Sequence, residues 1–256
     1  MQRWKLLIEY DGTPFVGWQR QDNGPSVQAA MERAVRAFAQ EERLVQCAGR
    51  TDAGVHALGQ VAHVDIEKPV SALKLRDALN HHLKPDPVAV LAVEAVSPDF
   101  HARFSATGRA YLYRVLDRRA PPTIERGKVW HTGIRLDADA MHHAAQALLG
   151  RHDFSSFRAA ECQADSPIRT LDRIAVARVG EELHLTIGAR SFLHHQVRNI
   201  MGTLAMIGRG KRPIGFAGDV LGARDRTKAG PTAPPDGLYL TQVTYDETGM
   251  HNVLSS

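Results

Sequence analysis

Four short stretches in the first part of the chain are rich in apolar residues, and residues 61–66 direct alternate side chains to two faces, which together predict four β-strands. Two intervening stretches carry apolar residues at helical spacing, each after a serine suited to an N-cap, Ser26 and Ser71. The strands are expected at residues 4–10, 43–47, 60–66 and 88–96. The predicted order β-α-β-β-α-β is that of a ferredoxin-like unit, with helices on one face of an antiparallel sheet.

The same order of elements returns in the rest of the chain, without a convincing repeat of the sequence itself. Strands are expected at residues 110–116, 168–179, 182–189 and 238–245, and helices at residues 137–149 and 195–207. Residues 118–128 and the Pro- and Gly-rich residues 222–237 interrupt the pattern. We therefore predict an α+β protein of two related ferredoxin-like halves, residues 1–104 and residues 105–256. If their sheets join, a ligand-binding cleft is expected between them.

A glycine-rich turn separates the second and third predicted strands of the first half. Residues 48–56 read Ala-Gly-Arg-Thr-Asp-Ala-Gly-Val-His, and Gly49, Gly54 and Gly59 punctuate the segment. Such glycines indicate either backbone angles that other residues avoid or the close approach of another group. The spacing of Gly49 and Gly54 suits a phosphate-binding loop, but Val55 and His56 stand where that loop needs lysine and serine or threonine. A different chemistry is therefore favoured.

The turn displays one cation and one carboxylate, Arg50 and Asp52. An aspartate in a glycine-rich turn commonly does no more than accept hydrogen bonds from its own backbone. A neighbouring guanidinium, however, lowers the pKa of a carboxyl group and keeps it ionised. Because an ionised and positioned carboxylate is a potential nucleophile, Asp52 is the leading candidate for a catalytic residue.

Length and charge set broad limits on the class of protein. A chain of 256 residues that is 43% hydrophobic can bury a substantial core in two modest domains. The net charge of +4 is uneven, because residues 1–104 hold 12 Lys and Arg against 13 Asp and Glu, whereas the remainder holds 20 against 15. A basic C-terminal half fits a phosphate-rich partner, although charge alone separates RNA from an acidic protein poorly.

Cysteines, histidines and apolar runs argue against several other classes. Cys47 and Cys162 form neither a disulfide framework nor a metal-ligand spacing. Paired histidines at residues 81–82 and 142–143 lack the H-E-x-x-H spacing of a zinc site. The longest apolar run, residues 88–93, is too short to span a bilayer. We expect a cytoplasmic protein with no metal, no cofactor and no membrane partner.

The glycine-rich turn and several further blocks together resemble the tRNA pseudouridine synthase A family. The match begins with Gly-Arg-Thr-Asp-Ala-Gly-Val-His at residues 49–56 and extends in order along the whole chain. Further blocks are Glu-Tyr-Asp-Gly-Thr (9–13), Gly-Trp-Gln-Arg-Gln (17–21), Ser-Val-Gln (26–28), Phe-Ser-Ala-Thr (104–107), Tyr-Leu-Tyr (111–113), His-Asp-Phe-Ser-Ser-Phe-Arg (152–158), Phe-Leu-His-His-Gln-Val-Arg-Asn-Ile (192–200) and Gly-Leu-Tyr-Leu (237–240). So many ordered matches are very unlikely to arise by chance.

This resemblance implies a fold, a reaction and a partner. The two halves are expected to share a largely antiparallel central sheet with the active-site cleft between them, and a homodimer is expected to place a tRNA across both subunits. The implied reaction isomerises uridine to pseudouridine in the anticodon stem-loop, at about positions 38–40 of tRNA. The reaction breaks the C1′–N1 bond, rotates the freed uracil and rejoins it through C5, so it needs no cofactor.

The resemblance also assigns catalytic roles. Asp52 matches the catalytic aspartate of the family, and Arg50 is expected to hold Asp52 and keep it ionised. Tyr111 matches the active-site tyrosine, although an aromatic residue on a strand more often belongs to a core. Its ring can stack on uracil, and its phenol can relay the C5 proton.

Substrate contacts are expected from several further residues. Arg198, which follows His194 and His195, could pair with Asp52 or with a phosphate, and Leu238 would form an apolar wall beneath the base. The target nucleotide must leave its stack to reach Asp52, so binding should combine phosphate contacts with base flipping. The candidate phosphate contacts are Arg20, Arg109, Arg114, Lys211, Arg212 and residues 224–228.

Two other functions compete with this interpretation. A catalytically silent RNA-binding protein could use the same scaffold, and it would bind tRNA without chemistry at Asp52. A metal-dependent hydrolase is the third possibility, and it would lose its activity in a chelator.

Overall fold

The N-terminal half of the computed structural model, which describes residues 1–246, follows the predicted order of elements. Its strands are β1 (Gln2–Tyr10), β2 (Gln46–Cys47), β3 (His56–Ile66) and β4 (Val88–Val96), and its helices are α1 (Val27–Ala39) and α2 (Ala72–Leu83). Ser26 and Ser71 cap the two helices, because each side chain accepts a hydrogen bond from the backbone N–H three residues further on.

The C-terminal half begins with β5 (Ala106–Leu116), so the predicted boundary after residue 104 falls in the connection between β4 and β5. Residues 247–256 of the second predicted domain lie outside the described residues. The other strands are β6 (Trp130–His131), β7 (Gly150–Asp153), β8 (Ile168–Val179), β9 (Glu182–Ala189) and β10 (Leu238–Tyr245). The helices are α3 (Ala138–Gln146), α4 (Gln196–Gly208) and α5 (Phe216–Ala223), with short 3-10 turns at Ser155–Phe157 and Arg226–Lys228.

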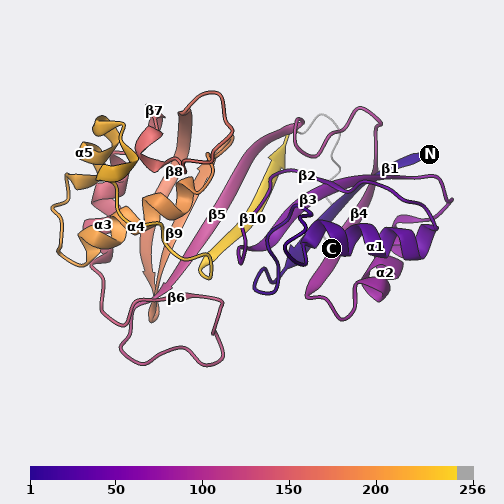
Figure 1. Cartoon of the computed structure of the whole chain (residues 1–256), viewed down its shortest axis with the longest axis horizontal. Coiled ribbons are helices and arrows are strands. Elements are labelled where there is room, and N and C mark those ends of the chain that lie inside the picture. The colour runs from indigo at the N-terminus through magenta and orange to yellow at the C-terminus, as the bar shows by residue number, and fades with distance from the viewer. Residues whose placement is uncertain (247–256) are drawn as a thin grey trace.

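The strands of both halves form one sheet in the order β4-β1-β3-β10-β5-β9-β8-β7, with β2 beside β3 and β6 beside β5 (Figure 1). When β6 and β7 are left aside, the strands of each half lie along the sheet in the order fourth, first, third and second. The order is β4, β1, β3 and β2 in one half and β10, β5, β9 and β8 in the other. Pairing is antiparallel except between β3 and β10 and between β5 and β6. The predicted pair of ferredoxin-like halves sharing a largely antiparallel sheet is confirmed.

The two halves join where the start of β3 pairs in parallel with β10, His56 with Tyr239 and Ala57 with Leu240. β2 occupies the same edge of β3 further along that strand. Because β2 is only two residues long, the start of β3 remains open to β10. The loop from β2 to β3, which carries Asp52, therefore ends at the junction between the halves.

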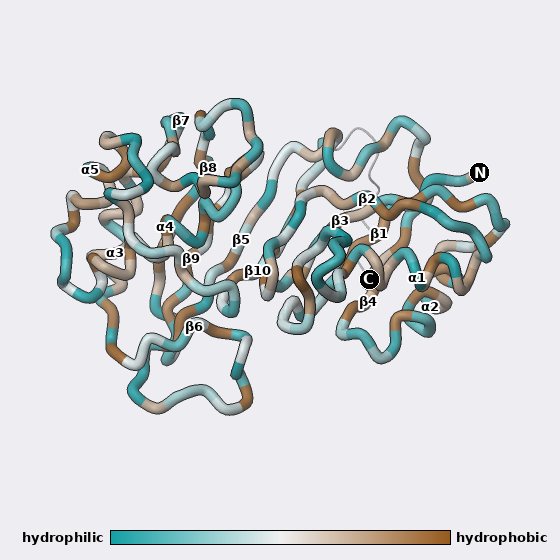
Figure 2. Tube along the Cα trace, viewed as in Figure 1, coloured by the Kyte–Doolittle hydropathy of each residue, from teal (hydrophilic) through white to brown (hydrophobic). Residues whose placement is uncertain are grey.

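Two hydrophobic cores lie on either side of this junction, and brown hydrophobic segments recur along the strands and helices of both halves in Figure 2. β10 contributes to both cores, since Leu238 belongs to the C-terminal core and Leu240 to the N-terminal one. Tyr111 on β5 packs against both. None of the helices within residues 1–246 is long and apolar enough to cross a membrane.

The structure differs from the predicted elements mainly in the C-terminal half. The pattern of the sequence does not predict β6, β7 or α5. Helix α5 contains Gly218 and Gly222 within eight residues, and glycine has a low helix propensity, so local sequence signals it poorly. The helix predicted at residues 137–149 is wrong at its end, because α3 stops at Gln146 and Gly150, with φ of 90°, begins β7.

The close approach of β3 and β10 predicts that Gly59→Ala destabilises the junction. A Cβ at Gly59 would lie 2.4 Å from the backbone oxygen of Thr241, so the two strands would have to separate. We expect a lower thermal unfolding temperature, equivalent to about 1–3 kcal/mol, as for an overpacked core. Gly49→Ala is the matched control, because a Cβ at Gly49 meets no atom within 4 Å. Equal unfolding temperatures for the two variants would contradict this account.

Candidate active site

The loop that carries Asp52 is held against the loop between β1 and α1. The Trp18 N–H donates a hydrogen bond to the Thr51 carbonyl at 3.0 Å, and the Thr51 hydroxyl lies 2.7 Å from the Tyr10 hydroxyl. Gly17 has φ of 113°, and a Cβ there would lie 2.6 Å from the Thr51 carbonyl oxygen. Only glycine fits at that position without strain. Thr51 is fixed through both backbone and side chain, which sets the direction of Asp52.

Two of the three glycines noted in the turn have the geometry that the sequence suggests. Gly54 adopts φ of 76°, in the region that favours glycine. Gly59 instead permits the close approach of β10. Gly49 shows neither feature, so its role is not explained by backbone conformation or by a neighbouring group within residues 1–246.

His56, the last residue of the matched block, connects both halves behind the loop. Its ring is 1% exposed and stacks on Tyr239 with ring centroids 4.7 Å apart. The Gly12 N–H donates to its Nδ1 at 3.0 Å, and its Nε2 lies 3.2 Å from the Asp236 carbonyl oxygen. These contacts make His56 a structural anchor for the loop that ends in β3.

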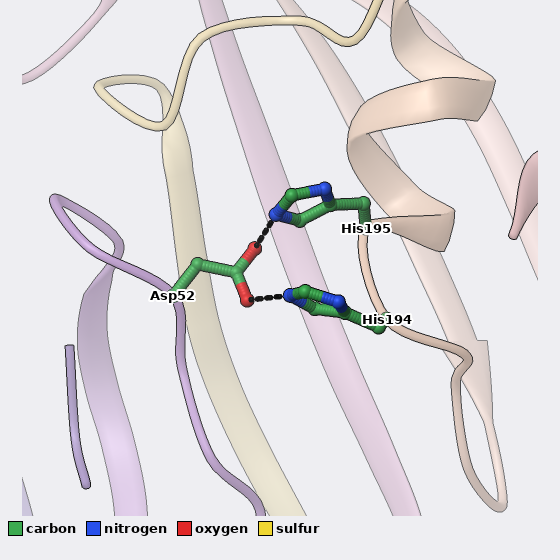
Figure 3. A group of neighbouring side chains, drawn as sticks. All are labelled: Asp52, His194 and His195. Atoms are coloured by element: carbon green, nitrogen blue, oxygen red, sulfur yellow. Dashed lines mark ion pairs between the residues drawn. The ribbon is translucent and has the colours of Figure 1, made fainter. Parts of the chain in front are cut away.

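Asp52 faces the residues at the start of α4, which belong to the other half (Figure 3). Its Oδ1 lies 3.3 Å from Nε2 of His194, and its Oδ2 lies 3.3 Å from Nε2 of His195. The same Oδ2 lies 3.2 Å from Nη1 of Arg198. Since 24% of the Asp52 side chain is exposed, the carboxylate is sheltered and still open to a ligand.

The charges around Asp52 decide its protonation. Burial alone raises the pKa of the Asp52 carboxyl, but the His194 hydrogen bond and the positive charges of His195, His194 and Arg198 outweigh burial. The pKa of Asp52 therefore lies below its ordinary value, and the group is a carboxylate at neutral pH. The hydrogen bond to Asp52 raises the pKa of His194, whereas burial lowers the pKa of His195. Of the two imidazoles, His194 carries more of the positive charge.

The backbone before α4 directs the two imidazoles and the guanidinium to one point. His195 precedes the helix with φ of 60°, a left-handed conformation that is uncommon for residues with a Cβ and recurs at functional sites. Arg198 lies in the first turn of α4, and its Nε donates to the Ala233 carbonyl at 2.8 Å. That bond anchors the guanidinium and leaves Nη1 for Asp52.

Tyr111 is the aromatic residue of the site. Its ring meets the Phe192 ring edge-on at 90°, with centroids 5.1 Å apart. Burial, and then the negative charge of Asp52, raise the pKa of the Tyr111 hydroxyl, so the phenol is neutral at pH 7. Leu240 is its partner on β10, whereas Leu238 pairs with Tyr113 and is buried in the C-terminal core.

The cation that contacts Asp52 differs from the one expected. Arg50 is exposed, and no ion pair or hydrogen bond joins it to Asp52 within the part of the chain that the structure describes. Arg198 makes the ion pair, which was one of its two predicted alternatives. Sequence reasoning gave His194 and His195 no role of their own, although their position next to Arg198 in one matched block was an available signal.

Several predicted phosphate contacts are engaged within the protein. Arg109 donates to the backbone carbonyls of Ala48, Arg103 and Arg190. Arg20 pairs with Glu32 at 3.0 Å, although 66% of its side chain stays exposed. Other engaged cations are Arg114, which pairs with Glu125 and Glu182, and Arg226, which bonds to Asn199, Gly230 and Thr232.

A cavity of about 760 Å³ lies away from Asp52. Leu112, Arg114 and Leu116 of β5 line it, whereas Tyr111 and Tyr113 of the same strand face the cores. Because successive side chains of a strand point to opposite faces, this cavity is on the other side of the sheet from the Asp52 cluster. The chemistry of the site therefore does not involve it.

The raised pKa of His194 predicts a pH-dependent contribution to stability. Asp52 stabilises protonated His194 only in the folded chain, so this contribution is complete below the unfolded pKa of about 6.5. It is lost as the pH rises through the higher folded pKa. We expect His194→Gln to lower the free energy of unfolding at about pH 6 by at most about 1 kcal/mol, because the pair is partly solvated, and to have less effect at about pH 9.

Thermal unfolding of the wild-type chain and of His194→Gln across this pH range measures the effect. In an Asp52→Asn background the His194→Gln substitution should lose most of its pH dependence, because the partner charge is gone. A destabilisation by His194→Gln that grows with pH would contradict the assignment.

Comparison with known proteins points to a single family. A family model described as tRNA pseudouridine synthase matches residues 6–105 and 144–246. The tRNA pseudouridine synthase A of Rhodospirillum centenum is 63% identical over 245 residues, spanning 96% of this chain and 100% of the relative. That of Maricaulis maris is 60% identical over 245 residues, spanning 96% and 98%. A solved Cbf5-Nop10-Gar1 complex overlaps at 13% identity with a TM-score of 0.35, too low to bear on the fold or the chemistry.

Proposed function

Since the chain belongs to the tRNA pseudouridine synthase family, we propose that it isomerises uridine to pseudouridine in the anticodon stem-loop, at about positions 38–40 of tRNA. The observation that carries this proposal is the ionised Asp52 at the junction of the two halves, bound by side chains of the opposite half and close to Tyr111. The protein is an isomerase, and its substrate is tRNA.

The reaction needs a carboxylate that is charged before the base arrives. Breaking the C1′–N1 bond demands a nucleophile or base that is already ionised at neutral pH, held in a place that keeps the detached uracil from escaping. Asp52 meets this requirement because its pKa is depressed although most of its surface is covered. Attack on C1′, addition to C6, and removal of a ribose proton to give a glycal all start from this same carboxylate.

Arg198 and the two histidines have different parts in the proposal. Arg198 is anchored to Ala233 and is 14% exposed, so it holds the carboxylate in place and in its ionised form. His194 and His195 are more exposed, at 39% and 26%, on the side that a ligand can reach. They shield Asp52 in the free enzyme and contact the substrate when it binds.

Tyr111 and Leu238 complete the proposed pocket. The Tyr111 ring packs perpendicular to the Phe192 ring, which fixes its orientation, and a face of the Tyr111 ring can stack on the uracil. Its neutral hydroxyl can carry the proton that leaves C5, because the raised pKa keeps it from ionising without a reaction. Leu238, buried at 5% exposure in the C-terminal core, supports this region from β10.

RNA binding is proposed on the surface around Arg50. Arg109 draws the backbone of residues 48, 103 and 190 together, and Arg50, Arg103 and Arg190 are exposed at or near these points. Three exposed cations around the residues that Arg109 draws together suit the phosphates on both sides of a flipped nucleotide. Arg109 supports this surface from within, and Arg20 remains a predicted outer contact.

The assembly and compartment follow from the substrate. We keep a homodimer as part of the proposal, because a tRNA is longer than one active site and can contact a second subunit. Modification of tRNA takes place where tRNA is made and used, so the proposed compartment is the cytoplasm.

Replacing the nucleophile tests the reaction. Asp52→Asn should bind tRNA but lower the release of tritium from C5-labelled uridine by at least about 10³-fold, because the amide cannot act as a carboxylate. Asp22→Asn is the matched control, since Asp22 is exposed in the loop before α1 and should not affect turnover. Tritium release by Asp52→Asn at the wild-type rate would refute the assignment of Asp52 as the nucleophile. If the wild-type chain released no tritium, a silent RNA-binding protein would be favoured.

Tyr111→Phe tests the proton transfer separately from binding. The ring remains, so tRNA affinity should change little, while the loss of the hydroxyl should lower turnover by about 10²–10⁴-fold. Tyr245→Phe is the control, because the Tyr245 hydroxyl donates to the Ala102 carbonyl at 2.8 Å and is not in the proposed pocket. Single-turnover kinetics and filter binding measure the two quantities. An unchanged rate for Tyr111→Phe would remove its catalytic role.

A further inference from the structure

Asp52, His194 and His195 form a cluster that the proposed reaction does not fully explain. Each residue offers one potential metal-ligand atom, and these three atoms all lie within 4.8 Å of one another. In Figure 3 the two imidazoles face the two oxygens of the Asp52 carboxylate. Two imidazole nitrogens and one carboxylate oxygen are the donor set of many zinc sites. Shielding Asp52 and contacting the substrate do not by themselves require an imidazole nitrogen at each carboxylate oxygen, so this arrangement calls for a further account.

The distances of the cluster suit a small divalent ion. Zinc binds imidazole nitrogen and carboxylate oxygen at about 2.0–2.2 Å, so neighbouring ligands of a tetrahedral ion lie about 3.3 Å apart. Nε2 of His194 lies 3.3 Å from Oδ1 and Nε2 of His195 lies 3.3 Å from Oδ2, so each imidazole is at this spacing from a different oxygen of the same carboxylate. Three ligands would leave the fourth position to water, because Asp52, His194 and His195 each keep an exposed fraction.

One neighbouring charge opposes a metal ion. Arg198 lies 3.2 Å from Oδ2 of Asp52, and its guanidinium repels a second cation at that oxygen. Oδ1 faces His194, whereas Arg198 contacts Oδ2, so Oδ1 is the oxygen better placed for a metal. Repulsion from the fixed guanidinium should make binding weaker than in a dedicated zinc enzyme.

We propose that Asp52, His194 and His195 bind one divalent transition-metal ion of the zinc class in the free protein, and that the bound ion blocks isomerisation. The ion is an inhibitor and not a cofactor, because it occupies the carboxylate that must attack the nucleotide. The ligand set and the Irving–Williams order give the selectivity: Cu²⁺ and Zn²⁺ bind, Mn²⁺ binds more weakly, and Mg²⁺, which prefers oxygen ligands, leaves the site empty. The metal-binding half of the proposal is independent of the proposed function, and only the inhibition rests on it.

The binding test uses the whole chain and Zn²⁺ alone, titrated calorimetrically or against a chromophoric chelator. We expect one high-affinity Zn²⁺ per chain, and a loss of affinity of at least about tenfold in His194→Asn, in His195→Asn and in Asp52→Asn. The matched control is the double variant His81→Asn/His82→Asn, which removes another histidine pair, from α2, and should keep the high-affinity site. Unchanged affinity in the His194 and His195 variants, or its loss in the His81/His82 control, would overturn the proposal.

The inhibition test measures tritium release with and without Zn²⁺. Wild-type activity should fall at least about tenfold at saturating Zn²⁺, recover when a chelator is added, and stay unchanged in Mg²⁺. Stoichiometric Zn²⁺ binding without inhibition would refute the blocking role. Loss of activity in a chelator would also refute it, because the ion would then be required for the reaction. If the wild-type chain released no tritium at all, the proposed function would fail while the calorimetric result would still decide the metal site.

Discussion

The ion pair between Asp52 and Arg198 is the contact on which the rest of the site depends. It joins side chains 146 positions apart, one on the loop before β3 and one on α4. A carboxyl group in this place without a cation would be driven toward its neutral form, because burial raises its pKa. Together with the His194 hydrogen bond and the charges of the two imidazoles, the pair keeps the carboxylate charged, and it holds a loop of one half against a helix of the other. Loss of Asp52 would leave the largely covered guanidinium of Arg198 without its carboxylate, which is the costly outcome for such pairs.

That ion pair is possible only because of how the two sheets join. The brevity of β2 opens the edge of β3 to β10, and the glycine at residue 59 lets the strands come close together. Tyr111 then lies on the strand next to β10 and contacts both cores. The proposed active site thus lies where both halves supply part of the packing. A uridine bound at the proposed site would contact both halves, in line with the general preference of ligands for clefts between domains.

The sequence predicted the strands better than the site. Strands β8, β9 and β10 match their predicted limits to the residue, because alternation is a local signal and Gly180, with φ of 60°, marks the turn between the first two. Asp52 was also identifiable, since the block around it is contiguous. Of its partners, Arg198 was predicted only as one of two alternatives and the histidines were not predicted, because pairing with α4 depends on how two sheets meet far away in sequence. Arg50 was expected to be the partner because it is two residues away, but it is exposed and Arg198 fills that place.

The arrangement around Asp52 has a consequence for how substrate reaches it. Each carboxylate oxygen is engaged by an imidazole, and a hydrogen bond to a charged group contributes about 1.5–3 kcal/mol. An oxygen held in this way cannot approach a ribose or a uracil until a partner yields. Arg198 is anchored to Ala233 and is the least exposed of the three, whereas the imidazoles face the side that is open to ligands. The histidines are therefore the partners that must give way, and contacts made elsewhere along the RNA have to offset their loss.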